Sequence, residues 1–345
     1  MYNNIPLNQR LQKLPKFELH VHLEGFVDAR FWSEMLDRNQ VVERPSLEEL
    51  EERFNFTDFA GFIACFRDLV HDFQNPRDFY HLTKKALAQQ AAQGVIYTET
   101  YFTPIFYIDR GMNFHEIMQE VSLAAKEALR DWGIEMKILF DGVRNFGPPS
   151  VRRIFELATL DETGLVTGVG IGGDEKNFPA HQFIDEFAYA RSQGLNLVCH
   201  AGETDGEASM LDAIELLGAL RIGHALGIEE GSRIEEVIQK YDVSLELCPT
   251  SNLQTGQIKR LEDHPFGLYL KRGYQISLNS DDPGFFQSSI LGEYEAMGRI
   301  HHLGPAEYCQ LSLRALDSAF LPRVARDRWA KQVLQYFESW SQALG

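Results

Sequence analysis

Residues 17–25 have the sequence FELHVHLEG, an apolar run in which hydrophobic and polar side chains alternate. Such alternation predicts a buried β-strand. Because side chains two residues apart point to the same side of a strand, His20 and His22 would present two imidazoles side by side. Two imidazoles on a rigid strand could bind a borderline metal such as zinc, or could be hydrogen-bonded histidines of the core. The rest of the chain has to decide between these interpretations.

Seven more apolar segments rich in β-forming residues follow, and stretches with helical patterning separate them. The eight predicted strands are 17–22, 95–102, 136–143, 166–173, 195–202, 220–226, 243–248 and 275–281. Helical patterning is clear at 78–93, 183–193 and 232–241. Strands that alternate with helices predict a parallel sheet, and eight of them predict an α/β protein with a closed (β/α)8 barrel, the TIM-barrel fold.

Extra helices are expected at two places in this barrel. The segment between the first two strands is too long for one crossover helix, so it should hold helices that cover the top of the barrel as a lid. Within it, Ser46 and Glu49 form a capping-box pattern, and Thr57 or Asp58 could cap the following helix. The tail from Gly304 onward is expected to add further helices packed on the barrel.

Composition limits the partners and the setting of the protein. The 345 residues carry a formal net charge of −17, which disfavours nucleic acid and anionic membranes, since both need a basic surface. The four cysteines lack C-x-x-C spacing and are expected to be reduced, buried thiols of a cytoplasmic protein. We see no signal peptide and no apolar run of the roughly 18 residues that a membrane span needs. Without a linker or repeat, residues 1–345 are predicted to form one domain, in an oligomeric state that the sequence leaves open.

The most unusual polar residues fall where the predicted strands end, and barrel enzymes place their chemistry at those ends. Three imidazoles and one carboxylate there suit a single catalytic zinc ion that keeps an exchangeable position. The predicted ligands of this one ion per chain are His20, His22, His200 and Asp281. Such an ion would lower the pKa of its water toward neutrality and make hydroxide available.

Other residues at the same ends suggest roles in hydrolysis. Glu203, on the turn that leaves the fifth strand, could carry a proton to a substrate, and His224 could orient or deprotonate the water. Asp282 could accept a hydrogen bond from a substrate ring. Gly172 and Gly173 have no side chain, so a flat ligand could approach their backbone closely.

Each of these residues also has an ordinary structural explanation. Glu24 and Glu203 could be solvated loop acids, and His224 could be a satisfied core histidine. Asp282 followed by Pro283 resembles the start of a helix. Since these explanations require independent coincidences at the strand ends of one barrel, the joint pattern favours an enzyme.

The chain resembles the adenosine/adenine deaminase family of the amidohydrolase superfamily. The segments that carry the resemblance, in family order, are ELHVHLEG at 18–25, GVIYTETYFTP at 94–104, GVGIGGDE at 168–175, HAGE at 200–203, RIGHA at 221–225, LCPTSN at 247–252 and SLNSDDP at 277–283. The resemblance implies a zinc-dependent (β/α)8 barrel in which hydroxide attacks C6 of a 6-aminopurine and ammonia leaves. Its partner would be a small purine base or nucleoside.

Family roles transfer to matching residues of this sequence. The resemblance again implies zinc ligands at His20, His22, His200 and Asp281. It makes Glu203 the proton donor to the purine N1 and His224 the residue that handles the attacking water. It also implies that Asp282 accepts a hydrogen bond at the N7 side and that the Gly173 backbone donates to N3.

The substrate is less well defined than the reaction. The expected reaction converts adenosine or deoxyadenosine to inosine or deoxyinosine, as in purine metabolism or salvage. Adenosine deaminases commonly have Asp where this chain has Glu24, which would lie near the group on N9, and SDDP at 280–283 leans toward adenine deaminases. GGDE at 172–175, in contrast, favours the enzymes that act on nucleosides. Adenine, N6-substituted adenines and modified adenosines therefore stay open, with a catalytically inactive purine-binding relative as a remote alternative.

Two related kinds of hydrolase fit less well. Dinuclear members of the superfamily typically need a bridging carboxylated lysine at the end of the fourth strand, whereas Lys176 lies past that strand. His22-Leu23-Glu24 matches the H-x-E of base-editing zinc deaminases, but their P-C-x-x-C partner motif is missing. A mononuclear barrel enzyme is therefore favoured.

Overall fold

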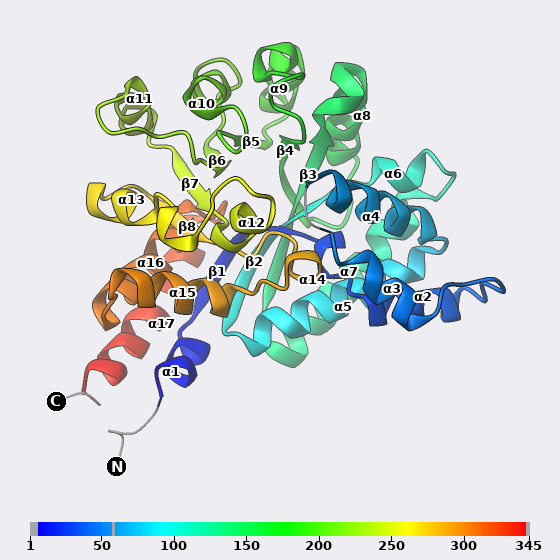
Figure 1. The fold of residues 1–345 in the computed structure, drawn as a ribbon, viewed down its shortest axis with the longest axis horizontal. Coiled ribbons are helices and arrows are strands. Elements are labelled where there is room, and N and C mark those ends of the chain that lie inside the picture. Colours follow the sequence, from blue (N-terminus) through cyan, green and yellow to red (C-terminus); the bar gives the residue numbers. More distant parts are fainter. Residues whose placement is uncertain (1–5, 57–58, 343–345) are drawn as a thin grey trace.

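The computed structural model describes residues 6–56 and 59–342. In these residues, eight parallel strands pair in chain order and form a nearly closed barrel with helices around it (Figure 1). The strands are β1 (Lys16–His22), β2 (Val95–Phe102), β3 (Glu135–Val143), β4 (Val166–Gly172), β5 (Asn196–Ala201), β6 (Arg221–His224), β7 (Ser244–Leu247) and β8 (Ile276–Leu278). The predicted (β/α)8 barrel is confirmed.

The barrel closes where β8 meets β1, and a side chain does part of this pairing. Asn279 Oδ1 accepts hydrogen bonds from the backbone N–H groups of Leu19 (2.8 Å) and His20 (3.1 Å). Two residues beyond His20 and Asn279 along the same seam, the His22 N–H donates to the Asp281 carbonyl oxygen at 2.8 Å. The seam therefore places the two histidines of β1 directly beside Asp281.

Two strands end two or more residues earlier than the sequence predicts. The sixth was expected over 220–226 and the eighth over 275–281, but β6 stops at His224 and β8 stops at Leu278. The backbone is left-handed at His224 (φ 65°), Ala225 (φ 53°) and Asp281 (φ 62°), and a strand cannot continue through this conformation. Residues other than glycine rarely adopt it, and such strain gathers at functional sites, so residue type gave no warning of these ends.

The long segment after β1 forms helices, as expected. They are η1 (Glu24–Phe26), α2 (Ala29–Arg38), α3 (Leu47–Arg53), α4 (Phe59–Asp72) and α5 (Pro76–Ala92). The capping box between Ser46 and Glu49 at the start of α3 is confirmed. Thr57 and Asp58, the expected cap of the next helix, lie outside the described residues.

Aromatic packing shows where this helical segment sits. The ring of Phe62 packs against Phe285 (centroids 5.4 Å apart) and Phe286 (5.0 Å), and Phe56 contacts the same two rings. Phe285 and Phe286 belong to α14 (Pro283–Phe286), which is joined to β8 by residues 279–282. The segment therefore covers the C-terminal end of the strands, the position expected for a lid.

The remaining helices surround the barrel (Figure 1). They are α1 (Leu7–Lys13), α6 (Ile105–Ile108), α7 (Phe114–Trp132), η2 (Arg144–Phe146), α8 (Gly147–Thr159), η3 (Ala180–Phe183), α9 (Ile184–Ser192), α10 (Gly206–Glu215), α11 (Arg233–Tyr241), α12 (Pro249–Gln254), η4 (Leu261–Asp263), α13 (Phe266–Arg272), α15 (Ile290–His301), α16 (Pro305–Ser318) and α17 (Arg323–Gln342). The inward face of α11, for example, is apolar, with Ile234, Val237 and Ile238 buried.

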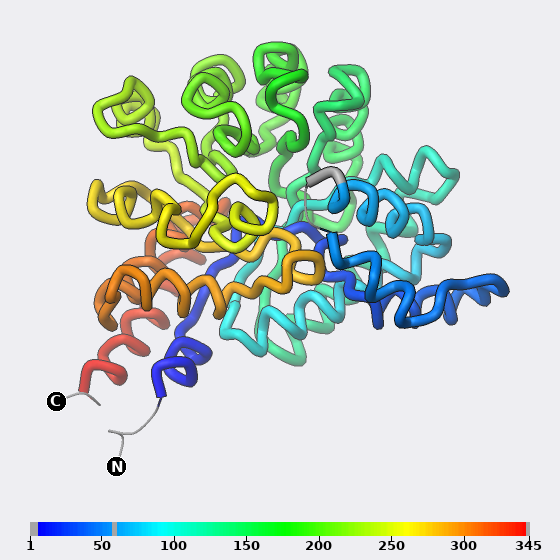
Figure 2. The backbone as a smooth tube through the Cα atoms, viewed as in Figure 1, coloured from blue at the N-terminus to red at the C-terminus, as the bar shows by residue number. Residues whose placement is uncertain are grey.

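The helical tail packs on the barrel as predicted. Figure 2 shows the red helix α17 close to the blue helix α1. The hydroxyl of Tyr336 donates a hydrogen bond to the Arg10 carbonyl oxygen at 2.6 Å, which joins these two helices. The four cysteines are buried and form no disulfide in the described chain, as expected. No helix within 6–56 or 59–342 has the length and apolar character needed to cross a membrane.

Candidate active site

The C-terminal ends of the strands bring the four predicted metal ligands to one point. Nε2 of His22 lies 3.4 Å from Nε2 of His200. Oδ1 of Asp281 lies 3.5 Å from Nε2 of His20 and 3.4 Å from Nε2 of His22. One ligand atom from each of the three histidines falls within 4.8 Å of the others. Three imidazole nitrogens and a carboxylate oxygen thus converge in the pattern that suits a divalent metal such as zinc.

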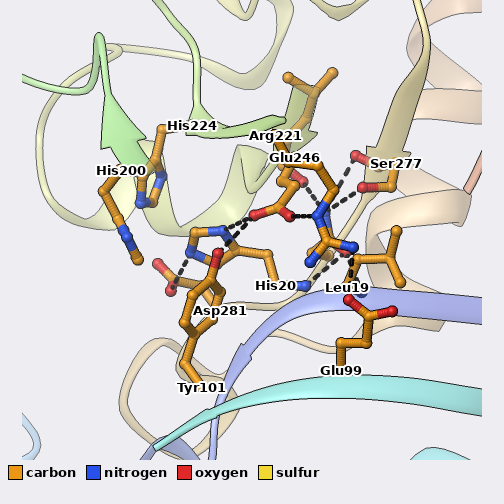
Figure 3. Close-up of polar contacts among 12 residues, drawn as sticks. Leu19, His20, Glu99, Tyr101, His200, Arg221, His224, Glu246, Ser277 and Asp281 are labelled. Carbon is orange, nitrogen blue, oxygen red and sulfur yellow. Dashed lines mark hydrogen bonds and ion pairs between the residues drawn. The ribbon is translucent and has the colours of Figure 1, made fainter. Parts of the chain in front are cut away.

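Two of the imidazole rings have an acceptor beside Nδ1, and Figure 3 shows the contact between His20 and Glu246. Nδ1 of His20 lies 2.7 Å from Glu246 Oε2, and Nδ1 of His200 lies 3.1 Å from the Ile171 carbonyl oxygen. An acceptor beside Nδ1 favours the tautomer with its proton there, so that Nε2 is the nitrogen that would face a metal, the arrangement usual for metal-bound histidines. Nε2 of His20 is buried and faces Oδ1 of Asp281 at 3.5 Å, with no other polar partner found among the described residues.

The electrostatics of the ligand cluster favour the ionised form of the Asp281 carboxylate. Burial alone would raise the pKa of Asp281, but hydrogen bonds from His20 and His22 hold it well below its usual value. Burial alone would lower the pKa of His20, and its contacts with Asp281 and Glu246 raise it to about 9. The negative charge of Asp281 is therefore retained where a metal ion would need it.

Glu203 and His224 lie together beside the ligand cluster. Oε2 of Glu203 is 3.7 Å from Nε2 of His224, whose Nδ1 lies 3.1 Å from the side-chain nitrogen of Asn252. Burial raises the pKa of Glu203 to about 8, with help from the negative charges of Asp281 and Glu175. Burial also lowers the pKa of His224 to about 3. At neutral pH the pair is therefore a protonated carboxyl beside a neutral imidazole, and the carboxyl can act as an acid.

Asp282 does not behave as an ordinary helix cap. It stands at the N-terminal cap position of α14, yet no capping hydrogen bond of its side chain is found in the described structure. The side chain is buried beside Gly25, where an added Cβ would lie only 2.5 Å from Asp282 Oδ1. This oxygen has no partner among the described residues, and burial followed by the charge of Asp281 raises the pKa of Asp282 to about 7. Oδ1 of Asp282 is thus a buried oxygen that could accept a hydrogen bond from a ligand.

Glu24 is buried, so the expectation of a solvated loop acid was wrong. The chain turns into η1 at Glu24, and only 1% of the residue is exposed. The Tyr107 hydroxyl donates to Glu24 Oε1 at 3.1 Å, and burial raises the pKa of Glu24 to about 7. The role of Glu24 near the N9 side of a purine stays a prediction.

Gly173 occupies a turn that needs glycine. Its φ of 102° lies in the left-handed region, and an added Cβ would lie 2.5 Å from Asn145 Oδ1. A side chain here is therefore excluded on two independent grounds. The role of its backbone toward a purine stays a prediction.

A buried chain of charged side chains lies behind the candidate metal ligands, and the sequence analysis did not predict it (Figure 3). Glu246 accepts from the Tyr101 hydroxyl at 2.9 Å and pairs with Arg221 Nε at 2.6 Å. Arg221 Nη1 in turn lies 2.6 Å from Glu99 Oε2. The available signal was an isolated charge within an otherwise apolar strand, as at Glu99 in VIYTETYF and Glu246 in SLEL. Buried charges are rare unless they are paired, so each of them predicts a partner inside the barrel.

Comparison with known proteins identifies the family. A family model described as adenosine deaminase matches residues 15–336. The chain belongs to the adenosine deaminase family. An aminodeoxyfutalosine deaminase of Streptomyces avermitilis is 32% identical over 338 residues, which cover 97% of this chain and 94% of that relative. This member of the family is therefore a hydrolase that acts on C–N bonds.

Solved structures of similar proteins agree with this assignment. The crystal structure of an adenine deaminase from Arthrobacter aurescens superposes with a TM-score of 0.87 at 25% identity, covering 94% of this chain and 99% of that one. An amidohydrolase from Burkholderia ambifaria, solved with bound zinc, superposes with a TM-score of 0.89 at 22% identity, covering 99% of this chain and 96% of that one. The second similarity supports the fold alone. The family members are metal-dependent deaminases, and the His/Asp cluster of this chain is a candidate metal site.

Proposed function

We propose that this protein is a zinc-dependent hydrolase that removes the amino group from C6 of a 6-aminopurine and releases ammonia. The observation that carries the proposal is the position of Glu203, protonated at neutral pH, next to three converging imidazoles and a carboxylate. The donor set supports zinc, and its four members are His20, His22, His200 and Asp281. Their convergence at one point supports one ion per chain.

The residues around the ligand cluster fit the needs of this hydrolysis. When bound, zinc supplies a water activated for attack at neutral pH. Glu203 donates its proton to ring nitrogen N1, which makes C6 more electrophilic. His224, whose Nε2 lies 3.7 Å from Glu203 Oε2, orients the attacking water. A C6–O bond then forms and the C6–N bond breaks. Of the two protons of the water, one restores Glu203 and the other goes to the amino nitrogen, which departs as ammonia while the oxygen stays on C6 as a carbonyl. The unpaired oxygen of Asp282 accepts a hydrogen bond at the N7 side and fixes the orientation of the ring.

The substrate that we propose is a purine nucleoside. Adenosine and deoxyadenosine are the expected substrates on sequence motifs, and the name of the relative at 32% identity makes aminodeoxyfutalosine the first modified nucleoside to test. Free adenine is the second candidate, favoured by Glu24 and by the fold shared with an adenine deaminase. Because a site with buried polar groups rejects ligands that leave those groups unpaired, one of these should be strongly preferred.

A substrate screen with zinc-loaded protein tests the proposal. Ammonia release is followed with adenosine, deoxyadenosine, aminodeoxyfutalosine, adenine and N6-substituted adenines, and Glu203→Gln serves as the control for each. We expect a much higher kcat/KM for one nucleoside than for adenine. A clear preference for adenine would replace the nucleoside proposal, and no turnover of any 6-aminopurine would contradict the reaction itself.

A further inference from the structure

Glu175 holds the turn that carries the catalytic acid. It follows β4 by three residues and is completely buried. Its carboxylate accepts hydrogen bonds from three consecutive backbone N–H groups: Gly202 at 2.8 Å, Glu203 at 3.0 Å and Thr204 at 3.1 Å. Successive amides that converge on one anion form a nest, a strong and directional way of fixing a backbone.

Both oxygens of this carboxylate are needed. Oε1 takes the amides of Glu203 and Thr204, whereas Oε2 takes the amide of Gly202 and the hydroxyl of Ser209 in α10. All four partners are donors, so only a group that accepts at both ends satisfies them. A glutamine has the same shape but turns an N–H toward one pair of donors.

Besides Glu175, the Leu226 N–H supports this turn among the described residues, by a hydrogen bond of 3.0 Å to the Gly202 carbonyl oxygen. Gly202 has a φ of 73°, and a Cβ there would lie 2.7 Å from the Met210 side chain, so the backbone conformation depends on glycine. The turn also lies directly between the metal ligand His200 and the start of α10 at Gly206. A shift of the turn would therefore move Glu203 while β5 kept its place.

We propose that Glu175 is a positioning residue for proton transfer: it locks the 202–204 turn so that the carboxyl of Glu203 stays beside His224. This inference rests on the proposed function, because it assigns Glu203 the acid's role. A displacement of about 1 Å in a reacting group can cost on the order of 100-fold in rate. The effect should fall on kcat, since Glu175 touches the turn and not the ligand cluster.

The experiment compares Glu175→Gln with Asp174→Asn. Asp174 is the adjacent carboxylate of the same motif, but its side chain bonds to Asn177 and not to the turn. For folded, zinc-loaded Glu175→Gln we expect a kcat lowered by roughly 10- to 100-fold, with KM and zinc content near those of the wild type. Asp174→Asn should have the kcat, the KM and the zinc content of the wild type. A wild-type kcat in Glu175→Gln, or a loss that appears only in KM, would overturn the inference.

A double variant separates this inference from the proposed function. If Glu175 acts through Glu203, adding Glu175→Gln to Glu203→Gln should cause no further loss of kcat. Fully additive losses would show an effect independent of Glu203 and would overturn the inference. If Glu203→Gln itself kept near wild-type activity, the proposed function would fail whatever Glu175 does.

A milder substitution covers the case in which Glu175→Gln does not fold. Ser209→Ala removes one donor from Oε2 and frees the carboxylate to shift, while leaving the three amides in place. Thermal melting shows whether each variant is folded. A folded Ser209→Ala variant should lose kcat several-fold at unchanged KM, and wild-type kcat in that variant would count against the positioning role.

Discussion

Nδ1 of His20 lies 2.7 Å from Oε2 of Glu246, and both side chains are fully buried. The glutamate thus fixes the ring whose other nitrogen points at the candidate metal position. Groups that orient metal-bound histidines typically contribute about 10- to 100-fold in metal affinity. We therefore expect Glu246→Gln to weaken zinc binding by that factor, as measured by competition with a chelator.

Glu99→Gln is the matched control for this prediction. Glu99 belongs to the same buried charge chain through Arg221, but no contact joins it to His20 among those found in the described residues. Breaking a buried ion pair typically costs about 3–5 kcal/mol of stability. Glu99→Gln should lower the melting temperature and leave zinc affinity nearly intact. Equal losses of affinity in both variants would show that Glu246 acts through general stability.

The ligand assignment predicts that metal and activity are lost together. Wild-type protein should contain about one zinc per chain by elemental analysis, since the described residues hold one cluster with three His and one Asp as candidate ligands. His20→Ala or Asp281→Ala removes a donor from this set and should abolish both zinc content and deamination. Metal-free wild type that still deaminates purines would contradict the assignment.

Removing the proton donor should separate metal binding from turnover. Glu203→Gln keeps the size of the side chain but cannot supply a proton, and proton transfer by a positioned group is worth about 10²- to 10⁴-fold in rate. Zinc content should stay at the wild-type level while kcat falls by this factor. His224→Ala should behave similarly. Near wild-type turnover in Glu203→Gln would mean that another residue is the acid.

The pKa of Glu203 predicts the alkaline side of the pH profile. Burial raises this pKa to about 8, so the acid form dominates below that pH and is lost above it. Because the reaction needs the protonated form, kcat/KM should hold level as pH approaches 8 from below and fall as pH rises further. The residual activity of Glu203→Gln should lack this decline. A decline of the same size in Glu203→Gln would assign it to a different group.

Selectivity near N9 should depend on Glu24. Shortening it to aspartate moves the carboxylate by one methylene, which is worth about 1–3 kcal/mol of discrimination. Glu24→Asp should therefore change the ratio of kcat/KM for adenosine over adenine by tens of fold, at unchanged zinc content. Tyr107→Phe removes only the hydrogen bond to Glu24 and serves as the matched control. An unaltered ratio in fully metallated Glu24→Asp would shift the origin of selectivity to the lid helices.

Local patterns carried much of the prediction. Alternation in FELHVHLEG and the repeat of strand and helix are written in neighbouring residues, so they predicted the barrel and its strand order. The rule that chemistry gathers at the C-terminal ends of strands then predicted that His20, His22, His200 and Asp281 would meet. The structure brings the three histidines together and places Asp281 beside His20 and His22. These features could be found because period and strand polarity are properties of short segments.

Other features depended on contacts that no short segment contains. His20 and Glu246 are 226 residues apart, and Glu175 reaches its amides across 27 to 29 residues. The turn at Glu24 that buries its carboxylate, and the left-handed backbone that ends β6 at His224, arise from packing around them. By itself, the sequence determined the barrel and the chemical groups at its rim, because periodicity and motif spacing are local. Only the tertiary structure decided which buried partners orient those groups, because hydrogen bonds and ion pairs form between atoms that folding brings within about 3 Å.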